Sequence, residues 1–228
     1  AIASKILSSM GIHLTAYTRS IGPVSISDDH FDPSAISETS TCMPDREADA
    51  RASAFLAQCM KEHDSAGGVV ECVVSGVPAG IGDPVFEKLD AMLSMAVMSI
   101  GAVKAVEIGD GIAAASRKGS ENNDAFYADH GQIKKKTNHA GGILGGISDG
   151  SEIILRAHFK PTPSIFQKQH TVTNTLENTE LEIRGRHDPV VVPRAVVVVE
   201  CMTALTILDA CMKNMTARLD YLVDFYQS

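Results

Sequence analysis

Tryptophan is absent from the sequence, and aromatic residues make up only 5% of it. A core built on large aromatic side chains is therefore excluded. The hydrophobic fraction nevertheless reaches 44% of 228 residues, which is enough for one sizeable core. Alanine, valine and isoleucine must supply most of the packing, and we expect a single domain over residues 1–228.

Paired or closely spaced cysteines are also lacking. The five cysteines are an odd number, and no two of them have the spacing Cys-x-x-Cys. This pattern predicts free thiols in a reducing compartment, without a disulfide framework or a zinc site, and no other metal site is predicted. No apolar run has the length and the flanking residues expected of a membrane span.

An excess of positive charge is a third absence. The formal net charge is −8, which argues against a nucleic-acid surface as the main role. An anionic ligand would have to be held by local basic residues against the overall field. The first residue is Ala1, and residues 1–12 resemble the end of an amphipathic helix with Gly11 as its C-cap. We therefore expect the sequence to be truncated at its N-terminus.

Alternating and β-branched stretches predict strands, separated by turns rich in glycine and proline. The predicted strands lie on either side of Gly22-Pro23 within 12–27, and at 69–77, 103–108 (short and buried), 152–159, 169–173 and 179–184. Helices are predicted at 44–62, 84–100 and 192–215. Because these elements do not alternate strictly as βαβ units, the expected fold class is α+β with a mainly antiparallel sheet.

Three stretches support more detailed predictions. The helix 44–62 should bury one stripe, formed by Ala54, Phe55, Cys59 and Met60. The helix 192–215 is apolar on most sides, as is typical of a core helix or an oligomer interface, and its Glu200 would need a partner if buried. The long polar segment 109–131 is predicted to be a loop, functional or mobile.

Three segments carry groups suited to an anionic ligand. In 137–146, paired glycines allow backbone amides to approach a ligand, although a tight turn explains them equally well. Residues 160–164 offer an ammonium and two hydroxyls to a phosphate, but taken alone an ordinary strand-end turn is the better explanation. Residues 184–189 combine Arg, His and Asp, which suit proton transfer or a salt-bridged loop. The lysines 134–136 could attract an anion, but a solvated loop is favoured.

Taken together, and in this order, the segments closely resemble the chorismate synthase family. The resemblance is carried by residues 64–68, 77–84, 99–111, 138–147, 160–164, 185–195 and Glu200, and it covers essentially the whole chain. It implies a β-α-β sandwich of mainly antiparallel sheets around helices. It also implies an anti-1,4-elimination of phosphate from 5-enolpyruvylshikimate-3-phosphate, which uses reduced FMN without net redox change and yields chorismate.

The resemblance has further implications for the complete enzyme. Members of this family are cytoplasmic and typically homotetrameric, and some reduce their own flavin with NADPH. Their partner is the small-molecule substrate, and neither nucleic acid nor a membrane is implied. A generic phosphate-binding α+β protein would require the ordered motifs to be a coincidence.

Matching the motifs residue by residue implies individual roles. Flavin contacts are implied for Gly101, Ala102, Gly145, Lys160, Pro161, Thr162, Pro163, Ser164 and Arg186. Asp188 matches the acid thought to take a proton from the N5 region of the flavin. Gly101 stands where Asn is frequent, which removes a side-chain contact, whereas Ser164 replaces a frequent Thr and keeps the hydroxyl.

The family's two catalytic histidines have no counterpart in the sequence, which resembles the C-terminal two-thirds of the enzyme. On sequence evidence, none of the eight histidines present replaces them. Two hypotheses follow. Either the sequence belongs to the FMN-dependent lyase, or the chain as given is a catalytically inactive fragment that keeps part of the FMN-binding capacity.

Overall fold

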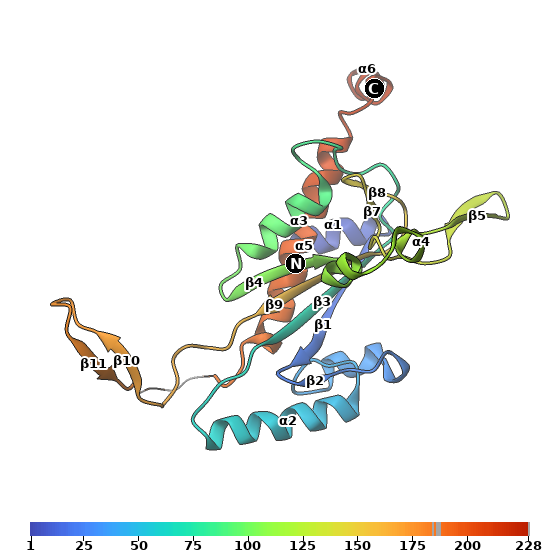
Figure 1. Ribbon diagram of the computed structural model, residues 1–228. Helices are drawn as coiled ribbons and strands as arrows, with labels where there is room; N and C mark the ends of the chain where they lie inside the picture. The colour runs from blue at the N-terminus through green and yellow to red at the C-terminus, as the bar shows by residue number, and fades with distance from the viewer. Residues whose placement is uncertain (184, 186–187, 228) are drawn as a thin grey trace. The chain divides into compact units, whose positions relative to one another are not determined.

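The computed structural model describes residues 1–183, 185 and 188–227, and for Gln132 the backbone alone. Its largest sheet has the strand order β2-β1-β3-β9-β4 (Figure 1). These strands are β1 (His13–Ile21), β2 (Val24–Ser25), β3 (Gly68–Ser75), β4 (Val103–Ile108) and β9 (Ile153–Phe159). The predicted strand–turn–strand at 12–27 is confirmed, because β1 and β2 pair antiparallel.

The other strands form antiparallel two-stranded ribbons. They are β5 (Phe126–Asp129) with β6 (Gln132–Lys135), β7 (Ile143–Leu144) with β8 (Ile147–Ser148), and β10 (Gln169–Val172) with β11 (Asn178–Leu181). The α-helices are α1 (Ile2–Ser9), α2 (Arg46–Lys61), α3 (Leu89–Met98), α4 (Gly119–Asn122), α5 (Val192–Asn214) and α6 (Leu219–Gln227). The 3-10 helices are η1 (Asp28–His30), η2 (Pro33–Ser37) and η3 (Gly111–Ser116). Helices combined with antiparallel sheets confirm the α+β class.

By its internal contacts the chain divides into two compact units. Unit 1 comprises Ala1–Ala16, Glu71–Ala157 and the chain from Val197 onwards, and unit 2 comprises Tyr17–Val70 and His158–Val196. The strands β1, β3 and β9 and the helix α5 each have residues in both units. A single domain over residues 1–228 stays a prediction.

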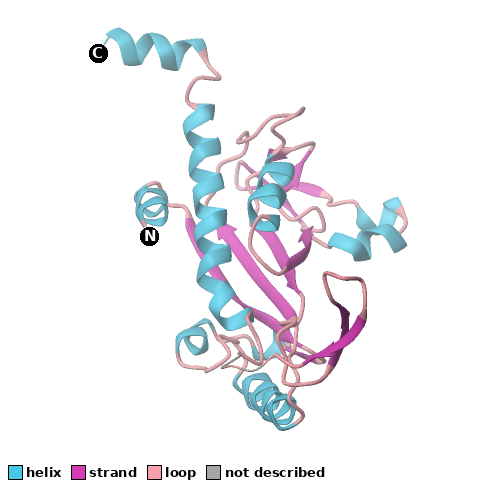
Figure 2. Ribbon diagram, turned by 90° about the vertical axis from the view of Figure 1, so that its left-hand side faces the viewer, coloured by secondary structure: helices cyan, strands magenta, loops and turns pink. Residues whose placement is uncertain are grey.

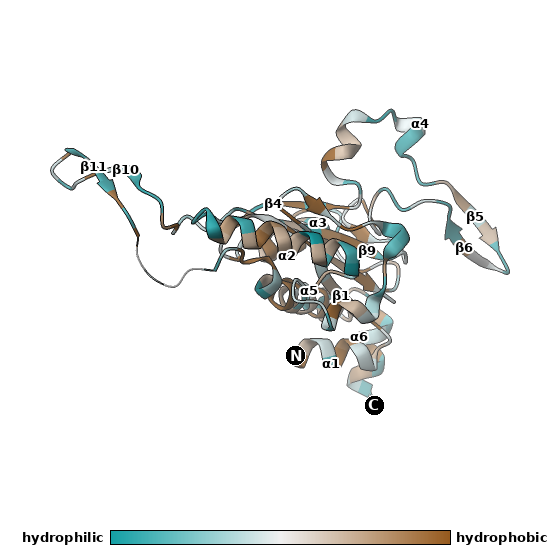
Figure 3. Ribbon diagram, turned by 90° about the horizontal axis from the view of Figure 1, so that it is seen from below, coloured by the Kyte–Doolittle hydropathy of each residue, from teal (hydrophilic) through white to brown (hydrophobic). Residues whose placement is uncertain are grey.

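The core is aliphatic, as the composition predicts. Among the described residues, Tyr17 and Phe159 are the only buried phenylalanine or tyrosine side chains. In Figure 3 the strands of the large sheet are mostly brown, whereas β6 and the β10–β11 ribbon are mostly teal. In unit 1, α5 runs alongside the strands (Figure 2) and buries Val199, Ala204 and Ile207 completely.

The helix α5 is long and apolar enough, by length and composition alone, to cross a membrane. No apolar run was expected to have both this length and suitable flanking residues. The helix α5 has the length, and length and composition alone do not test the flanking residues. Core helices pass the same test, and the fully buried Val199 and Ile207 are typical of a core helix. Val197 and Leu205 nevertheless remain 60% and 55% exposed, so α5 also carries uncovered apolar surface.

Two predicted elements are present but differ from the prediction, one in its burial and one in its first residue. The strand at 103–108 is confirmed, yet only Val103 of β4 is buried, because β4 lies at the edge of the sheet. The helix predicted from residue 84 begins only at Leu89. Phe86 adopts a φ of +62°, which is incompatible with a right-handed helix.

The buried stripe of α2 also differs from the prediction. The helix begins after the predicted Asp45 and buries Ala48, Ala52 and Cys59. Phe55 is half-buried, but Ala54 and Met60 are exposed. Two positions along a helix turn a side chain by about 200°, so Ala54 cannot share the face of Ala52.

The segment 109–131 was wrongly predicted to be one long loop. It contains η3, α4 and β5, and β5 pairs with β6 across a two-residue turn. His130 in this turn has a φ of +47°, the left-handed conformation that tight hairpin turns need. Each of these elements has six residues or fewer, too few to show a clear period in the sequence.

Candidate functional site

The turn that follows α2 joins two segments with predicted site residues, all within unit 2. The Ser65 hydroxyl donates a hydrogen bond to the carbonyl oxygen of Thr162 (2.7 Å). The Ala66 amide donates to the carbonyl oxygen of Pro189 (2.7 Å). The predicted flavin-binding segment and the segment of the predicted acid are therefore fastened to the same turn.

The end of α2 and one close approach set the path of this turn. His63 takes a left-handed φ of +57°, and the Asp64 amide donates back to the carbonyl oxygen of Cys59 (2.8 Å). A left-handed residue after the last turn is a common helix stop. A Cβ at Gly67 would lie 2.5 Å from the carbonyl oxygen of Phe159, so only glycine allows β9 to come this close.

A cavity of about 130 Å³ lies between these segments. Its lining includes Ser65, Ser164 and Asp188, and also His63 and Phe166, whose rings pack edge to face at 5.8 Å. At roughly 30 Å³ per water, the cavity has room for about four water molecules, or a phosphate-sized group. The structure thus brings together Ser164 and Asp188, which the sequence places 24 residues apart.

Asp188 is paired with the first turn of α5. Nη1 of Arg194 lies 2.8 Å from Oδ2 of Asp188, whose side chain is 44% exposed. Within the described part of the chain, no hydrogen bond to the other carboxylate oxygen, Oδ1, is found. A carboxylate held through one oxygen can accept a proton on the other.

Lys160 follows β9 and is exposed. Within the residues that the structure describes, it forms no ion pair. The loop behind it is held by the carbonyl oxygen of Pro163, which accepts from the Ile165 amide and from Nε2 of Gln169, both at 3.2 Å. This free ammonium suits an anionic phosphate. The predicted flavin contact Arg186 lies outside the described residues, as do Arg184 and His187.

We expect Lys160→Met to weaken FMN binding by about 10- to 100-fold. The substitution removes a charge-assisted hydrogen bond to a phosphate, which is worth about 1.5–3 kcal/mol. Flavin fluorescence titration measures the dissociation constant. Lys168→Met is the matched control, because Lys168 lies eight residues further on, is 73% exposed and already pairs with Glu180. Equal affinities of the two variants would contradict the prediction.

In unit 1, Gly145 lies at the tip of the β7–β8 ribbon. Gly145 and Gly146 form its two-residue turn, with φ of +61° and +90°, which is the turn type that needs two left-handed residues. A Cβ on Gly145 would meet no atom within 4 Å, whereas one on Gly146 would lie 2.5 Å from the carbonyl oxygen of Asp83. Gly146 packs against the protein, and Gly145 leaves open space for a ligand.

Gly101 and Ala102 form the turn between α3 and β4, also in unit 1. The Val103 amide donates to the carbonyl oxygen of Ile100 (3.2 Å), and a Cβ on Gly101 would meet no atom within 4 Å. Ala102 has a φ of +72°, a strained conformation for alanine. Strained residues cluster at ligand sites, and this one falls on a predicted flavin contact.

Ala102→Gly is expected to raise the free energy of unfolding by about 0.5–1 kcal/mol. The left-handed conformation costs alanine about 1–2 kcal/mol, and the greater flexibility of glycine in the unfolded chain offsets about half of the gain. Urea denaturation measures the change. The exposed helical residue Ala57 provides the control, since Ala57→Gly should destabilise the protein by about 1 kcal/mol. A loss of stability in both variants would contradict the claim that the backbone of Ala102 is strained.

The lysine run 134–136 does not behave as a solvated loop throughout. Lys134 pairs with Asp129 on the surface of the ribbon (2.6 Å). The side chain of Lys135, by contrast, is only 4% exposed, and its Nζ lies 2.7 Å from Asp149 and 3.4 Å from Asp124. The prediction was therefore wrong for Lys135, because its carboxylate partners lie 11 and 14 residues away in the sequence.

Two more features were not predicted from the sequence: the pairing of His139 and the exposure of Glu200. Nδ1 of His139 lies 2.6 Å from Oδ2 of Asp110, and Arg117 contacts both side chains, so this loop histidine is tied to the end of β4. Glu200, expected to be buried with a partner, is only half-buried. Neither the pairing nor the exposure can be derived from local periodicity.

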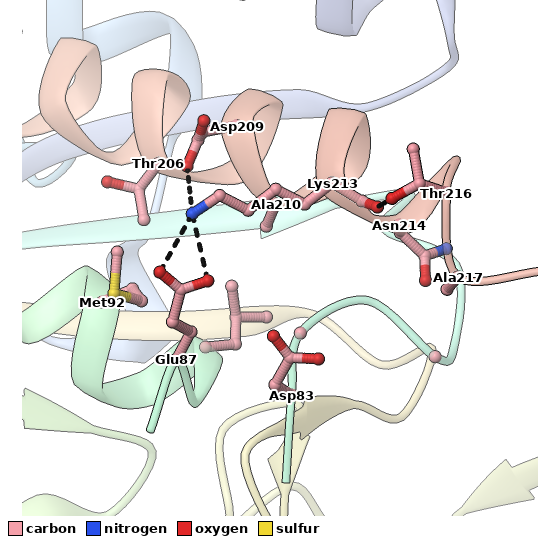
Figure 4. Close-up of a pocket in the computed structure, with 13 residues that line it drawn as sticks. Asp83, Glu87, Met92, Thr206, Asp209, Ala210, Lys213, Asn214, Thr216 and Ala217 are labelled. Carbon is pink, nitrogen blue, oxygen red and sulfur yellow. Dashed lines mark hydrogen bonds and ion pairs between the residues drawn. The ribbon is translucent and has the colours of Figure 1, made fainter. Parts of the chain in front are cut away.

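A larger cavity of about 560 Å³ lies elsewhere in unit 1 (Figure 4). Gly80, Gly82 and Asp83 line it, and they belong to the segment 77–84 noted in the sequence. On its other side, Nζ of Lys213 lies 3.2 Å from Glu87 and 3.1 Å from Asp209. The two carboxylates raise the pKa of Lys213 through hydrogen bonds. None of the predicted site residues lines this cavity.

Comparison with known proteins identifies the family. The sequence model of the chorismate synthase family matches residues 1–212. The chorismate synthase of Agathobacter rectalis is 57% identical over 227 residues, with 100% of this chain and 62% of the relative covered. That of Archaeoglobus fulgidus is 49% identical over 215 residues, with 93% and 59% covered.

A crystal structure of chorismate synthase superimposes with a TM-score of 0.79 at 27% identity, over 94% of this chain and 61% of the other. This similarity confirms the expected fold. The chain spans about 62% of the length of the first curated relatives it matches. On the evidence of the family model, the relatives and the fold, the chain belongs to the chorismate synthase family.

Proposed function

We propose that the protein takes part in the chorismate synthase reaction, the anti-1,4-elimination of phosphate from 5-enolpyruvylshikimate-3-phosphate with reduced FMN. The observation that carries the proposal is the cavity in unit 2. It is lined by both Ser164 and Asp188, residues that match two separate motifs of the family. The reaction class and the residue roles are those that the resemblance to the family implies, and the geometry of this cavity supports them.

Each unit, taken by itself, has described residues that suit a part of FMN. Lys160, free of ion pairs within the described chain, and the hydroxyls of Thr162 and Ser164 suit its phosphate. The open side of Gly145 allows a planar ring to approach the backbone. In unit 1, Gly101 is open in the same way, and the strained Ala102 is its neighbour.

Reduced FMN, when bound, would supply electron density to the substrate. The chain's own residues then have separate tasks. Lys160 and Ser164 bind the cofactor, and Arg194 orients Asp188 through Oδ2. Asp188 would take up a proton on its other oxygen, and the resemblance to the family implies the flavin N5 region as the donor. Ser65 keeps the cofactor segment beside the acid through its bond to Thr162.

A second candidate function is a chain that binds FMN in part but does not catalyse. It is favoured by one observation, that the chain spans only about 62% of the length of its relatives. The family's catalytic histidines are not found among the eight histidines of this sequence. In this case the residues above would bind cofactor without turnover.

The two candidates are separated by two measurements on the same protein. Flavin fluorescence titration measures FMN affinity, and an anaerobic assay with chemically reduced FMN and the enolpyruvyl substrate measures chorismate. Binding with turnover supports the first candidate, and binding without turnover supports the second. Folded protein with neither binding nor turnover would refute both.

We further infer a cytoplasmic homo-oligomer, a tetramer as in the family, that can draw on NADPH for flavin reduction. The uncovered apolar side chains of α5, such as Val197 and Leu205, support self-association. The net charge of −8 gives no support for nucleic acid as a partner.

A further inference from the structure

A buried ionic cluster surrounds Lys135 in unit 1. The side chains of Lys135, Asp124 and Asp149 are only 4%, 3% and 9% exposed. Nζ of Lys135 donates to Asp149 (2.7 Å), to Oδ1 of Asn138 (3.0 Å) and to Asp124 (3.4 Å). One ammonium thus binds three acceptors from three different parts of the chain.

The cluster lies at the base of the β7–β8 ribbon. Oδ1 of Asn138 also accepts from the amide of Gly142 (2.9 Å), the residue directly before the ribbon, and the ribbon ends just before Asp149. The amide of Asp149 closes the base by donating to the carbonyl oxygen of Gly142 (3.0 Å). Lys135 therefore holds both ends of the ribbon from a neighbouring strand, β6.

Asp124 fixes the approach to the ribbon. Its carboxylate accepts from the Thr137 hydroxyl (2.6 Å) and from the amides of His139 (2.8 Å) and Ala140 (3.0 Å). Side chains of this cluster therefore accept hydrogen bonds from four residues of the segment 137–142 that leads into the ribbon. The short strands of the ribbon, with two residues each, could not hold such a path alone.

A buried ion cluster is a costly way to gain stability. Apolar side chains of similar volume often stabilise a fold as well or better, because charges lose hydration on burial. The charged groups instead fix the orientation of the backbone, since each hydrogen bond holds one donor against one acceptor. In this cluster the orientation that is fixed is that of the ribbon carrying the Gly145–Gly146 turn.

We propose that Lys135 is a positioning residue for the flavin site, which acts by holding the Gly145–Gly146 turn through both ends of the β7–β8 ribbon. The proposal rests on the proposed function in taking Gly145 as an FMN contact. Lys135 itself touches no ligand in this proposal. Its effect on FMN is transmitted through Asn138 and Asp149.

The test compares Lys135→Met with the matched control Lys134→Met. Lys134 is the adjacent lysine, is 49% exposed and, among the residues that the structure describes, forms an ion pair with Asp129 of the β5–β6 ribbon alone. Hydrogen exchange of residues 142–149 measures the order of the ribbon without any ligand. Titration with FMN and the visible circular dichroism of bound FMN at saturation measure the consequence at the site.

For Lys135→Met we expect exchange in 142–149 to rise at least 10-fold, FMN affinity to fall at least 10-fold and the spectrum of bound FMN to change. Lys134→Met should stay within 2-fold of the wild type in both quantities. Unchanged exchange in a folded Lys135→Met protein would overturn the proposal. So would faster exchange with unaltered FMN affinity and spectrum, because the role would then be structural only.

A second variant decides the matter if Lys135→Met does not fold. Asp149→Asn keeps the shape of the side chain, and Lys135 keeps its charge partner Asp124. Asp149→Asn should also speed up exchange in residues 142–149 and weaken FMN binding, but by smaller factors than Lys135→Met. Exchange and FMN affinity equal to those of the wild type would overturn the proposal. If the wild type binds no FMN, the proposed function fails, and the exchange comparison alone decides whether Lys135 holds the ribbon.

Discussion

Asp124→Ala is expected to lower the free energy of unfolding by about 3–5 kcal/mol, the usual cost of breaking a buried ion pair from one side. The substitution leaves the amides of His139 and Ala140 without their acceptor, and it removes one of the two carboxylates facing Lys135. Denaturation in urea at pH 7 measures the loss. The effect should exceed that of any single surface substitution.

The pKa of Asp124 predicts how the stability lost in Asp124→Ala depends on pH. Burial raises the pKa of Asp124, but the bonds from Thr137, Ala140 and His139 and the charge of Lys135 outweigh it and lower the pKa to about 2. Because the folded-state pKa lies below the unfolded value, this stabilisation is fully present above about pH 5 and is lost as the pH falls towards 2. The difference between wild type and Asp124→Ala should therefore shrink over this range, by about 2 kcal/mol.

The control for Asp124 is Asp129 on the same β5–β6 ribbon. Asp129 is 34% exposed and pairs with the exposed Lys134, so Asp129→Ala should cost no more than about 0.5–1 kcal/mol at pH 7. Similar losses for the two alanine variants, or a difference that does not change with pH, would show that the buried cluster does not stabilise the fold in the way its geometry implies.

Much of the architecture could be predicted from the sequence, because local patterns specify it. The strand at 103–108 and the helix from Val192 have the predicted bounds to within a residue, and the Gly22-Pro23 turn separates two paired strands. The ordered motifs also predicted that Ser164 and Asp188 belong to one site. Their meeting in one cavity depends on Ser65 and Ala66, which the matched segment 64–68 contains.

The remaining features depend on partners far away in the sequence. Lys134, Lys135 and Lys136 are identical residues in a run, and the middle one differs in that its side chain is buried against the distant Asp124 and Asp149. The left-handed backbone of Phe86, which delays the start of α3, has no signal in a residue type that rarely adopts it. Both features are set by tertiary packing, which periodicity does not encode.

Asp188→Asn is expected to reduce turnover by about 100- to 10,000-fold, the range typical for loss of a general acid or base. Asparagine has nearly the same shape and can still accept a hydrogen bond from Arg194 through its amide oxygen, but it cannot take up a proton. FMN affinity should change less than 3-fold, because Lys160 and the hydroxyls of the 160–164 segment are untouched.

A fall in turnover without a fall in FMN affinity would show that Asp188 acts in proton transfer and not in binding the cofactor. Glu180→Gln, an exposed carboxylate in the same unit that pairs with Lys168, should leave both quantities unchanged. A loss of FMN affinity equal to the loss of rate in Asp188→Asn would assign Asp188 to cofactor binding instead. If the wild type binds FMN without turnover, the same pair of variants can be compared in a chimera that joins residues 1–228 to the part of a longer relative outside the matched region. A wild-type rate for Asp188→Asn in an active chimera would exclude Asp188 as the proton acceptor, because nothing but the ionisable oxygen has been removed.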